Sequence, residues 1–125
     1  MSKSLMIVDD SATMRKIIMR TIRMSGLEFE QVEEAGNGIE ALEKLSSQPV
    51  DFILCDVNMP EMNGVEMVEK VRSEIPGCSD TKIIMVSTES SEGLINDLIV
   101  KGANGYISKP FTPEKFKEKL LPLMN

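Results

Sequence analysis

Short apolar runs alternate along the chain with amphipathic stretches, and the first of these runs is Leu5 to Val8. Continuous apolar runs of this kind suit strands that are buried on both faces of a parallel sheet. We predict strands at residues 5–8, 31–35, 52–55, 83–86 and 106–107, of which the second has the weakest pattern and the fifth is the shortest. Strands and helices in strict alternation indicate an α/β fold with a mainly parallel sheet and right-handed crossovers.

The stretches after the predicted strands carry apolar residues at helical spacing, and the first predicted helix covers residues 12–25. Gly26 and Gly102 are natural helix stops, because glycine adopts the left-handed conformation that often follows a helix. Asn37 and Thr112 are typical N-caps, and Pro113 suits a first helical turn. We expect these apolar positions to form the inner faces of the helices: Met14, Ile17, Ile18, Ile22, Ile39, Ala41, Leu42, Leu45, Val65, Val68, Val71, Ile75, Leu94, Ile95, Leu98, Ile99, Phe116, Leu120 and Leu121.

Size and residue content narrow the classes of protein. The 125 residues fit one domain, which we expect to span residues 1–125. The apolar runs are far shorter than a membrane-spanning helix, and no signal-peptide stretch precedes the first acidic residues, so we expect a cytoplasmic protein without a membrane partner. The chain has no histidine, which excludes a Ser-His-Asp triad and any zinc site that needs imidazole. Cys55 and Cys78 are predicted to be free thiols, with Cys55 a small buried hydrophobe.

The net charge of −6 is unevenly distributed. Residues 26–100 hold four basic and sixteen acidic groups, whereas the segments on either side each hold five basic and two acidic groups. An acidic middle without interleaved aromatic and basic residues argues against a nucleic-acid partner.

Polar side chains follow four of the predicted strands. Asp9 and Asp10 follow the first, Asp56 the third, Ser87 the fourth and Lys109 the fifth. In open α/β sheets functional groups gather at the carboxyl ends of the strands. Crowded carboxylates repel or raise one another's pKa values, and Mg²⁺, which prefers oxygen ligands, relieves that repulsion. A lysine and a hydroxyl opposite such a carboxylate can hold a phosphoryl group, so the sequence indicates formation of an aspartyl phosphate.

These segments together resemble the response-regulator receiver domain. The resemblance is carried by Ile7-Val8-Asp9-Asp10-Ser11, by the segment from Asp56 to Gly64, by Ser87, and by Lys109-Pro110-Phe111. It covers essentially the whole chain and is greatest to the single-domain chemotaxis regulators, through Ser11 to Arg15, Asn58, Glu89 and Tyr106. It implies a flavodoxin-like (βα)5 fold, with a doubly wound five-stranded parallel sheet in the order 2-1-3-4-5, and no output domain.

The resemblance also implies a role for each matching residue. Asp56 would accept the phosphoryl group, Lys109 would contact it, and Ser87 would move to hydrogen-bond it while Tyr106 rotates inward behind. Asp10, Asp56 and the backbone carbonyl of Asn58 would bind Mg²⁺ directly, and Asp9 would help through water. The Lys109–Pro110 bond would be cis.

Three residues, Asn58, Thr88 and Glu89, would flank the route to the phosphoryl group. Ser87 stands where threonine is more frequent in the family, and the hydroxyl is retained. Thr88 stands where alanine or glycine is more usual, and its larger side chain would narrow access to the phosphoryl group.

The resemblance implies partners as well. A histidine kinase would donate the phosphoryl group, and a phosphatase would remove it. A target protein such as the flagellar motor switch would bind the face formed by the fourth helix, fifth strand and fifth helix. The protein would act as a monomer. A phosphorelay intermediate, or a regulator of a non-motility output, is the alternative within the family.

Two other classes of function compete with the switch. An aspartyl-phosphate phosphatase would need an acidic residue two positions beyond its nucleophile, where Asp56 is followed by Asn58. A flavin-binding module would need a phosphate-binding loop after the first strand, where Asp9 and Asp10 would repel the phosphate.

Overall fold

A parallel sheet forms the centre of the computed structural model, which describes residues 3–59, 62–88 and 91–124. Within these residues the strand order is β2-β1-β3-β4-β5, and every neighbouring pair is parallel. The flavodoxin-like order that the resemblance implied is therefore confirmed. The strands are β1 (Ser4–Val8), β2 (Gln31–Ala35), β3 (Phe52–Asp56), β4 (Lys82–Ser87) and β5 (Gly105–Ser108).

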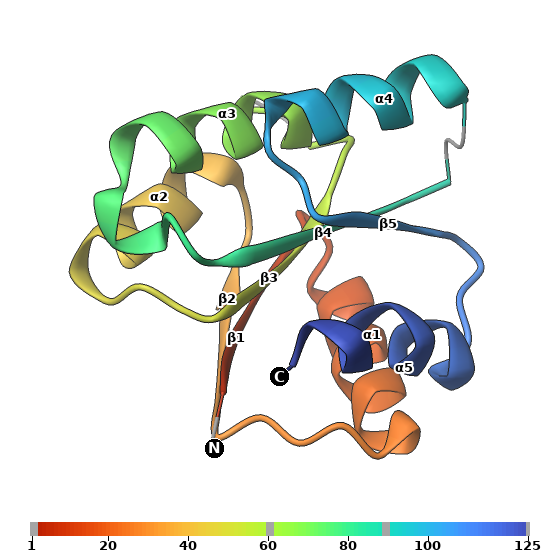
Figure 1. Ribbon diagram of the computed structural model, residues 1–125. Coiled ribbons are helices and arrows are strands. Elements are labelled where there is room, and N and C mark those ends of the chain that lie inside the picture. The colour runs from red at the N-terminus through yellow and green to blue at the C-terminus, as the bar shows by residue number, and fades with distance from the viewer. Residues whose placement is uncertain (1–2, 60–61, 89–90, 125) are drawn as a thin grey trace.

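Helices cover both faces of the sheet, as Figure 1 shows. One face carries α1 (Ala12–Ser25) and α5 (Pro113–Leu120), and the other carries α2 (Gly38–Ser47), α3 (Gly64–Glu74) and α4 (Glu92–Lys101). Short 3-10 turns follow α3 at Pro76–Cys78 and α5 at Leu121–Leu123. The arrangement is the doubly wound fold that strict strand–helix alternation predicts.

The sheet separates two apolar cores because successive strand residues point to opposite faces. In β1, Met6 and Val8 join the core under α2, α3 and α4, whereas Leu5 and Ile7 join the core under α1 and α5. All four side chains are buried, which explains why the strand reads as a continuous apolar run.

The helix ends confirm the punctuation predicted from the sequence. The side chains of Asn37 and Thr112 accept hydrogen bonds from backbone amides in the first turns of α2 and α5. Gly26 and Gly102 have φ values of 87° and 121°, so both take a positive-φ conformation that residues with a Cβ atom rarely adopt. Asn63 forms a reciprocal capping box with Glu66 at the start of α3.

Four of the apolar positions expected on inner helix faces are instead exposed. Ile17, Ile39, Ile99 and Leu121 each expose between 41% and 48% of their surface. Ile17, Ile39 and Ile99 lie at the margins of their helices' apolar stripes, where a rotation of about 100° per residue turns the side chain away from the sheet. Leu121 lies beyond the end of α5, in the 3-10 turn Leu121–Leu123. Helical spacing alone gives the centre of a stripe more reliably than its edge.

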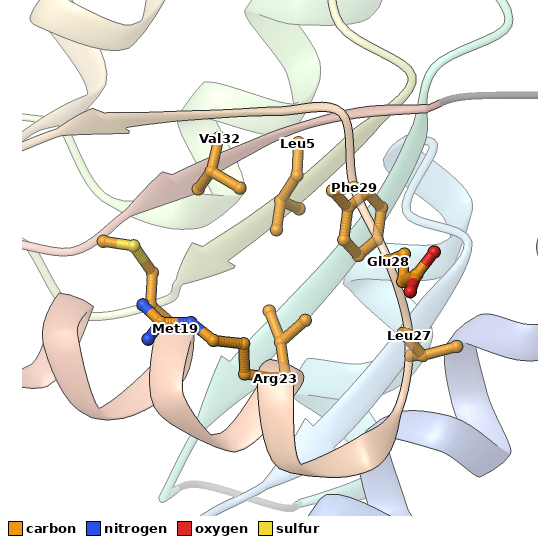
Figure 2. A pocket seen from close by; sticks show the side chains of 8 residues that line it. Leu5, Met19, Arg23, Leu27, Glu28, Phe29 and Val32 are labelled. Atoms are coloured by element: carbon orange, nitrogen blue, oxygen red, sulfur yellow. The ribbon is translucent and has the colours of Figure 1, made fainter.

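A hollow of about 420 Å³ lies at the amino-terminal half of β1, between the strands and the last turns of α1. Figure 2 shows Leu5 and Val32 on the sheet side, Met19 and Arg23 on α1, and Leu27 and Phe29 in the connection to β2. Because Leu5 lies near the start of its strand, this hollow is at the opposite edge of the sheet from Asp9 and Asp56.

Two further expectations concern sulfur and membranes. Cys55 and Cys78 are buried free thiols, as predicted, and burial raises the pKa of the Cys55 thiol above its usual range. None of the helices in the described part of the chain is long and apolar enough to cross a membrane.

Candidate functional site

The strand order brings the predicted acidic residues to one place. β1 ends at Val8, so Asp9 and Asp10 leave the sheet at its carboxyl edge, and Asp56 is the last residue of the neighbouring β3. The order of the strands changes direction between β1 and β3: β2 is added on one side of β1, whereas β3, β4 and β5 are added on the other side. Ligands of open α/β sheets bind at such a reversal, so the fold itself selects this crevice.

Three carboxylates and one ammonium meet in the crevice. Asp9, Asp10 and Asp56 each offer a carboxylate oxygen, and these oxygens lie within 4.8 Å of one another. The Lys109 Nζ lies 3.7 Å from Asp9 Oδ2 and 3.7 Å from Asp56 Oδ1. The four predicted side chains thus converge, although they come from three separate parts of the chain.

Burial makes the crevice electrostatically unfavourable for its own carboxylates. Asp9 and Asp56 are buried, whereas Asp10 is exposed. Burial raises the pKa of the Asp56 carboxyl, the Lys109 ammonium lowers it, and the Asp9 carboxylate raises it further. Burial likewise raises the pKa of Asp9, against the lowering effects of the Ser11 amide and Lys109. A cation in this place would remove the repulsion.

One buried carboxylate oxygen in the site fits coordination to a divalent cation. Asp9 Oδ2 is buried and has no hydrogen-bond partner among the described residues, and Lys109 Nζ is too distant from it for a hydrogen bond. Buried carboxylate oxygens are normally satisfied by a hydrogen bond, an ion or water. Three carboxylates that include one orphaned oxygen form a suitable donor set for a hard divalent cation such as Mg²⁺.

Backbone contacts fix the position of Asp9. Its amide donates to the carbonyl of Ala35 at 3.1 Å, and its Oδ1 accepts from the amide of Ser11 at 2.9 Å. Arg15 Nη1 donates to the Asp9 carbonyl at 2.6 Å, while Arg15 Nε pairs with Glu34 at 2.9 Å. These contacts of Arg15 were not predicted from the sequence, in which the available signal was a basic residue in the first turn of the helix that follows two acidic residues.

Gly64, at the start of α3, lies against the end of β3. A Cβ atom at this position would lie 2.5 Å from the carbonyl oxygen of Asp56 and 2.8 Å from Val57 Cα, and both of these are backbone atoms. The Gly64 amide also donates to the carbonyl of Val57 at 2.8 Å. Only glycine allows α3 to begin so close to Asp56, a constraint that the sequence analysis did not identify.

The ends of β4 and β5 place the remaining predicted residues. Ser87 is buried, and its carbonyl accepts from the Lys109 amide at 2.8 Å and from the Tyr106 hydroxyl at 3.3 Å. The Lys109–Pro110 bond is cis, as the resemblance implied. Thr88 is an exposed residue next to Ser87.

Asn58 and Glu89 complete the predicted set. Asn58 is exposed, and its backbone amide donates a hydrogen bond to the Asp56 carboxyl group. Glu89 lies outside the residues that the structure describes, so its predicted place beside the phosphoryl route stays a prediction.

Comparisons with known proteins agree with this geometry. The family model described as the response regulator receiver domain matches residues 5–121. The chain is 46% identical over 117 residues to the chemotaxis protein CheY1 of Helicobacter pylori, covering 93% of this chain and 92% of that protein. It is also 46% identical to a CheY homolog of Campylobacter jejuni, covering 93% of this chain and 88% of the homolog.

A solved structure gives the same result in three dimensions. The chemotaxis protein CheY4 of Vibrio cholerae superposes with a TM-score of 0.87 at 35% identity, covering 99% of this chain and all of that one. Proteins of this type are signalling proteins of two-component pathways. By its sequence, its strand order and its relatives, the chain belongs to the response regulator receiver domain family, among the members of the CheY chemotaxis type.

Proposed function

We propose that the chain is a phosphorylation-dependent switch of a chemotaxis pathway, with Asp56 as the residue that accepts the phosphoryl group from a histidine kinase. The observation that carries this proposal is the position of Asp56. Its carboxylate is buried at the end of β3, 3.7 Å from the Lys109 ammonium and within reach of two further carboxylates. Asp9 shares the ammonium and the candidate metal cluster, but its Oδ1 already accepts from the Ser11 amide, and of the two residues only Asp56 is the last residue of a strand.

The transfer step uses one oxygen of Asp56 as the nucleophile. A bond forms between this oxygen and the phosphorus of the donor, while the bond from phosphorus to the donor's imidazole nitrogen breaks. The imidazole keeps the electron pair and takes up a proton from solvent, so the product is a mixed anhydride on Asp56 and a neutral histidine. Lys109 neutralises charge on the phosphoryl oxygens as a point charge, which needs no planar geometry.

Magnesium fits the proposed site. Asp10, Asp56 and the backbone carbonyl of Asn58 would hold it directly, and Asp9 would act through water. When bound, the ion neutralises the negative charge of the phosphoryl oxygens during transfer. The hydrogen bonds that Asp9 accepts from Ser11 and Arg15, and the one that its amide donates to Ala35, keep Asp9 in place for this role.

The switch itself would be a population shift at the ends of β4 and β5. A phosphoryl group on Asp56 would favour the state in which the Ser87 hydroxyl and Lys109 both contact it. The Ser87 carbonyl accepts hydrogen bonds from the Lys109 amide and the Tyr106 hydroxyl, so a movement of Ser87 would also shift Tyr106 on β5. Thr88, Asn58 and Glu89 would control access of water or of a phosphatase.

The readout surface would be the face formed by α4, β5 and α5. A hollow of about 320 Å³ lies there, lined by Ile95, Tyr106, Ile107, Ser108, Lys115, Glu118 and Lys119. Its exposed lysines favour an acidic partner segment, and by family resemblance the partner would be the flagellar motor switch. We propose a single receiver domain that acts as a cytoplasmic monomer by binding this partner.

The decisive experiment is phosphorylation by acetyl phosphate with Mg²⁺, followed by intact mass spectrometry. The wild type should gain the mass of one phosphoryl group, and Asp56→Asn should gain none. Asp80→Asn, which removes an exposed aspartate, is the matched control and should behave as the wild type. Phosphorylation of Asp56→Asn at the wild-type rate would refute the assignment of the acceptor.

A second measurement addresses the target. Binding of an isolated flagellar motor switch protein should be stronger for the chain loaded with beryllofluoride and Mg²⁺ than for the unloaded chain. Equal binding of the two states would favour the alternative of a relay or of a different output.

A further inference from the structure

Arg72, on α3, makes a set of hydrogen bonds that joins four parts of the chain. Its Nε and Nη2 both donate to the carbonyl of Gly102, at 3.1 and 2.9 Å. Its Nη1 donates to the carbonyl of Cys78 at 2.9 Å, and its Nη2 also donates to Asn104 Oδ1 at 2.9 Å. The guanidinium therefore ties α3 and its following turn to the end of α4 and the residue before β5.

The bonds continue from Asn104 into the sheet. Asn104 Oδ1 also accepts from the amide of Ile83, at 2.8 Å, and the Asn104 amide donates to the carbonyl of Ile83 at 2.7 Å. Gly102 has a positive φ, and a Cβ there would lie 2.7 Å from Arg72 Cγ, so glycine both ends α4 and makes room for the arginine. Arg72, Gly102 and Asn104 together form what we call the Arg72 clasp.

Among the described residues, the two ends of α4 differ in what they bond. At the carboxyl end, the clasp is accompanied by hydrogen bonds from the Gly102 amide to the Ile99 carbonyl and from the Ala103 amide to the Leu98 carbonyl, at 3.1 and 2.9 Å. At the amino end, the bonds of the described residues stay within the first turn: the Leu94 amide donates to Ser91 Oγ at 3.4 Å, and the Ile95 amide donates to the Ser91 carbonyl at 3.1 Å. Between them the helix has a single fully buried side chain, Leu98. Leu94 and Ile95 are half-buried, so we expect the end that is bonded to other elements to be the less mobile one.

We propose that Arg72 is a positioning residue of the switch, holding the carboxyl end of α4 and the start of β5 still while the amino-terminal half of α4 responds to phosphorylation. This inference rests on the proposed function of the α4–β5–α5 face. The clasp needs arginine in particular, because three of its nitrogens donate in fixed directions to several acceptors at once. A lysine would keep the charge but could not bridge the same acceptors.

Amide hydrogen exchange of the full chain tests the proposal, with and without beryllofluoride and Mg²⁺. In the wild type, beryllofluoride should change the amide exchange rates of residues 92–95. The exchange rates of Gly102, Ala103 and Asn104 should stay within about twofold of their values without beryllofluoride. Arg72→Ala should speed exchange at those last three amides by about tenfold beyond any change in global stability, measured by urea unfolding. Arg72→Lys should lie between the two.

Lys101→Ala is the matched control. Lys101 lies at the same end of α4 and pairs with Glu69 and Asp97 at 3.7 and 3.8 Å, but its ammonium makes no hydrogen bond to the backbone of the described residues. It should leave exchange at the clasp unchanged. In Arg72→Ala, the response to beryllofluoride should spread to the carboxyl end of α4, a readout that loss of stability alone would not move.

Three results would overturn the proposal. They are a wild-type response of equal size at both ends of α4, an unchanged exchange rate at Gly102 to Asn104 in Arg72→Ala, and an equal effect of Lys101→Ala. Failure of the proposed function is distinguishable, because Asp56 would then not be phosphorylated by acetyl phosphate in any variant. If Asp56 is phosphorylated normally but the carboxyl end of α4 in the wild type responds to beryllofluoride, only the proposed role of Arg72 is refuted.

Discussion

Replacing Asp56 with asparagine should stabilise the protein in the absence of divalent cations at pH 8. The substitution keeps the size of the side chain and removes one negative charge from a buried cluster. Burial, and after it the Asp9 carboxylate, raise the pKa of Asp56, and the lowering effect of Lys109 does not compensate for them. The folded state therefore disfavours the charged form of this residue, which is the form that the unfolded chain has at neutral pH.

The size of the effect follows from the distances. The buried Asp9 carboxylate lies within 4.8 Å of Asp56 and repels it by roughly 3.5 kcal/mol at an effective dielectric constant of about 20, and the exposed Asp10 adds a repulsion that solvent screens more strongly. The Lys109 ammonium at 3.7 Å attracts Asp56 by roughly 4.5 kcal/mol on the same scale, so the charge interactions largely cancel. The desolvation of a buried carboxylate remains, and an amide suffers it less. We expect a gain of about 1–2 kcal/mol, or roughly 3–10 °C in Tm for a domain of this size.

The sign of the pH dependence is determined by the raised pKa. As pH rises above 3.8, the unfolded chain releases the Asp56 proton before the folded chain does. The folded state then binds more protons, so wild-type stability falls across the window from 3.8 up to the raised folded pKa and stays lower above it. Asp56→Asn lacks this contribution, and its advantage should therefore grow through that window and vanish in acid.

The assay is urea unfolding followed by circular dichroism from pH 4 to pH 8 in the presence of EDTA. Glu30→Gln, which removes one exposed negative charge far from the crevice, is the control and should differ little from the wild type. A variant at position 56 that is less stable than the wild type at pH 8, or whose advantage does not change with pH, would refute the reasoning.

Three further predictions concern the same region. Gly64→Ala should lower the free energy of unfolding by about 1–3 kcal/mol because its Cβ would meet the backbone of Asp56, whereas Gly93→Ala, with open space around it, should raise it by about 0.5–1 kcal/mol; equal effects in urea titrations would contradict the close approach at Gly64. Thr88→Ala should speed loss of phosphate from the phosphorylated chain, and an unchanged or slower decay in a phosphate-release time course would reject the idea that its side chain narrows access. Mg²⁺ at ten times its Kd should stabilise the wild type by about 1.4 kcal/mol and Asp56→Asn by less, so an equal shift in the melting temperatures would place the ion elsewhere.

Much of the fold could be predicted because the three central strands, β1, β3 and β4, are buried on both faces. Leu5 to Val8 and Phe52 to Cys55 read as unbroken apolar runs, and their ends coincide with acidic residues. Parallel connectivity then brings the carboxyl ends of these strands to one edge of the sheet, which is why the crevice could be predicted from the sequence.

Other features depend on contacts between distant residues, which no local pattern reveals. The close approach of Gly64 to Asp56 depends on how α3 begins against β3, and the contact between Arg15 and the Asp9 carbonyl depends on where α1 starts. The exposure of Ile99 depends on how α4 is rotated on the sheet. Strand order was likewise obtained from family resemblance, since alternation alone is compatible with several orders.

The crevice gathers its charges from widely separated parts of the chain, and this has a consequence during synthesis. Asp9 and Asp56 leave the ribosome well before Lys109, which follows the last strand. An incomplete polypeptide therefore presents its acids without the compensating ammonium and should be a poor phosphate acceptor. Under the proposed function, only a chain that includes Lys109 would carry the signal, so unfinished chains would not compete with it for the kinase.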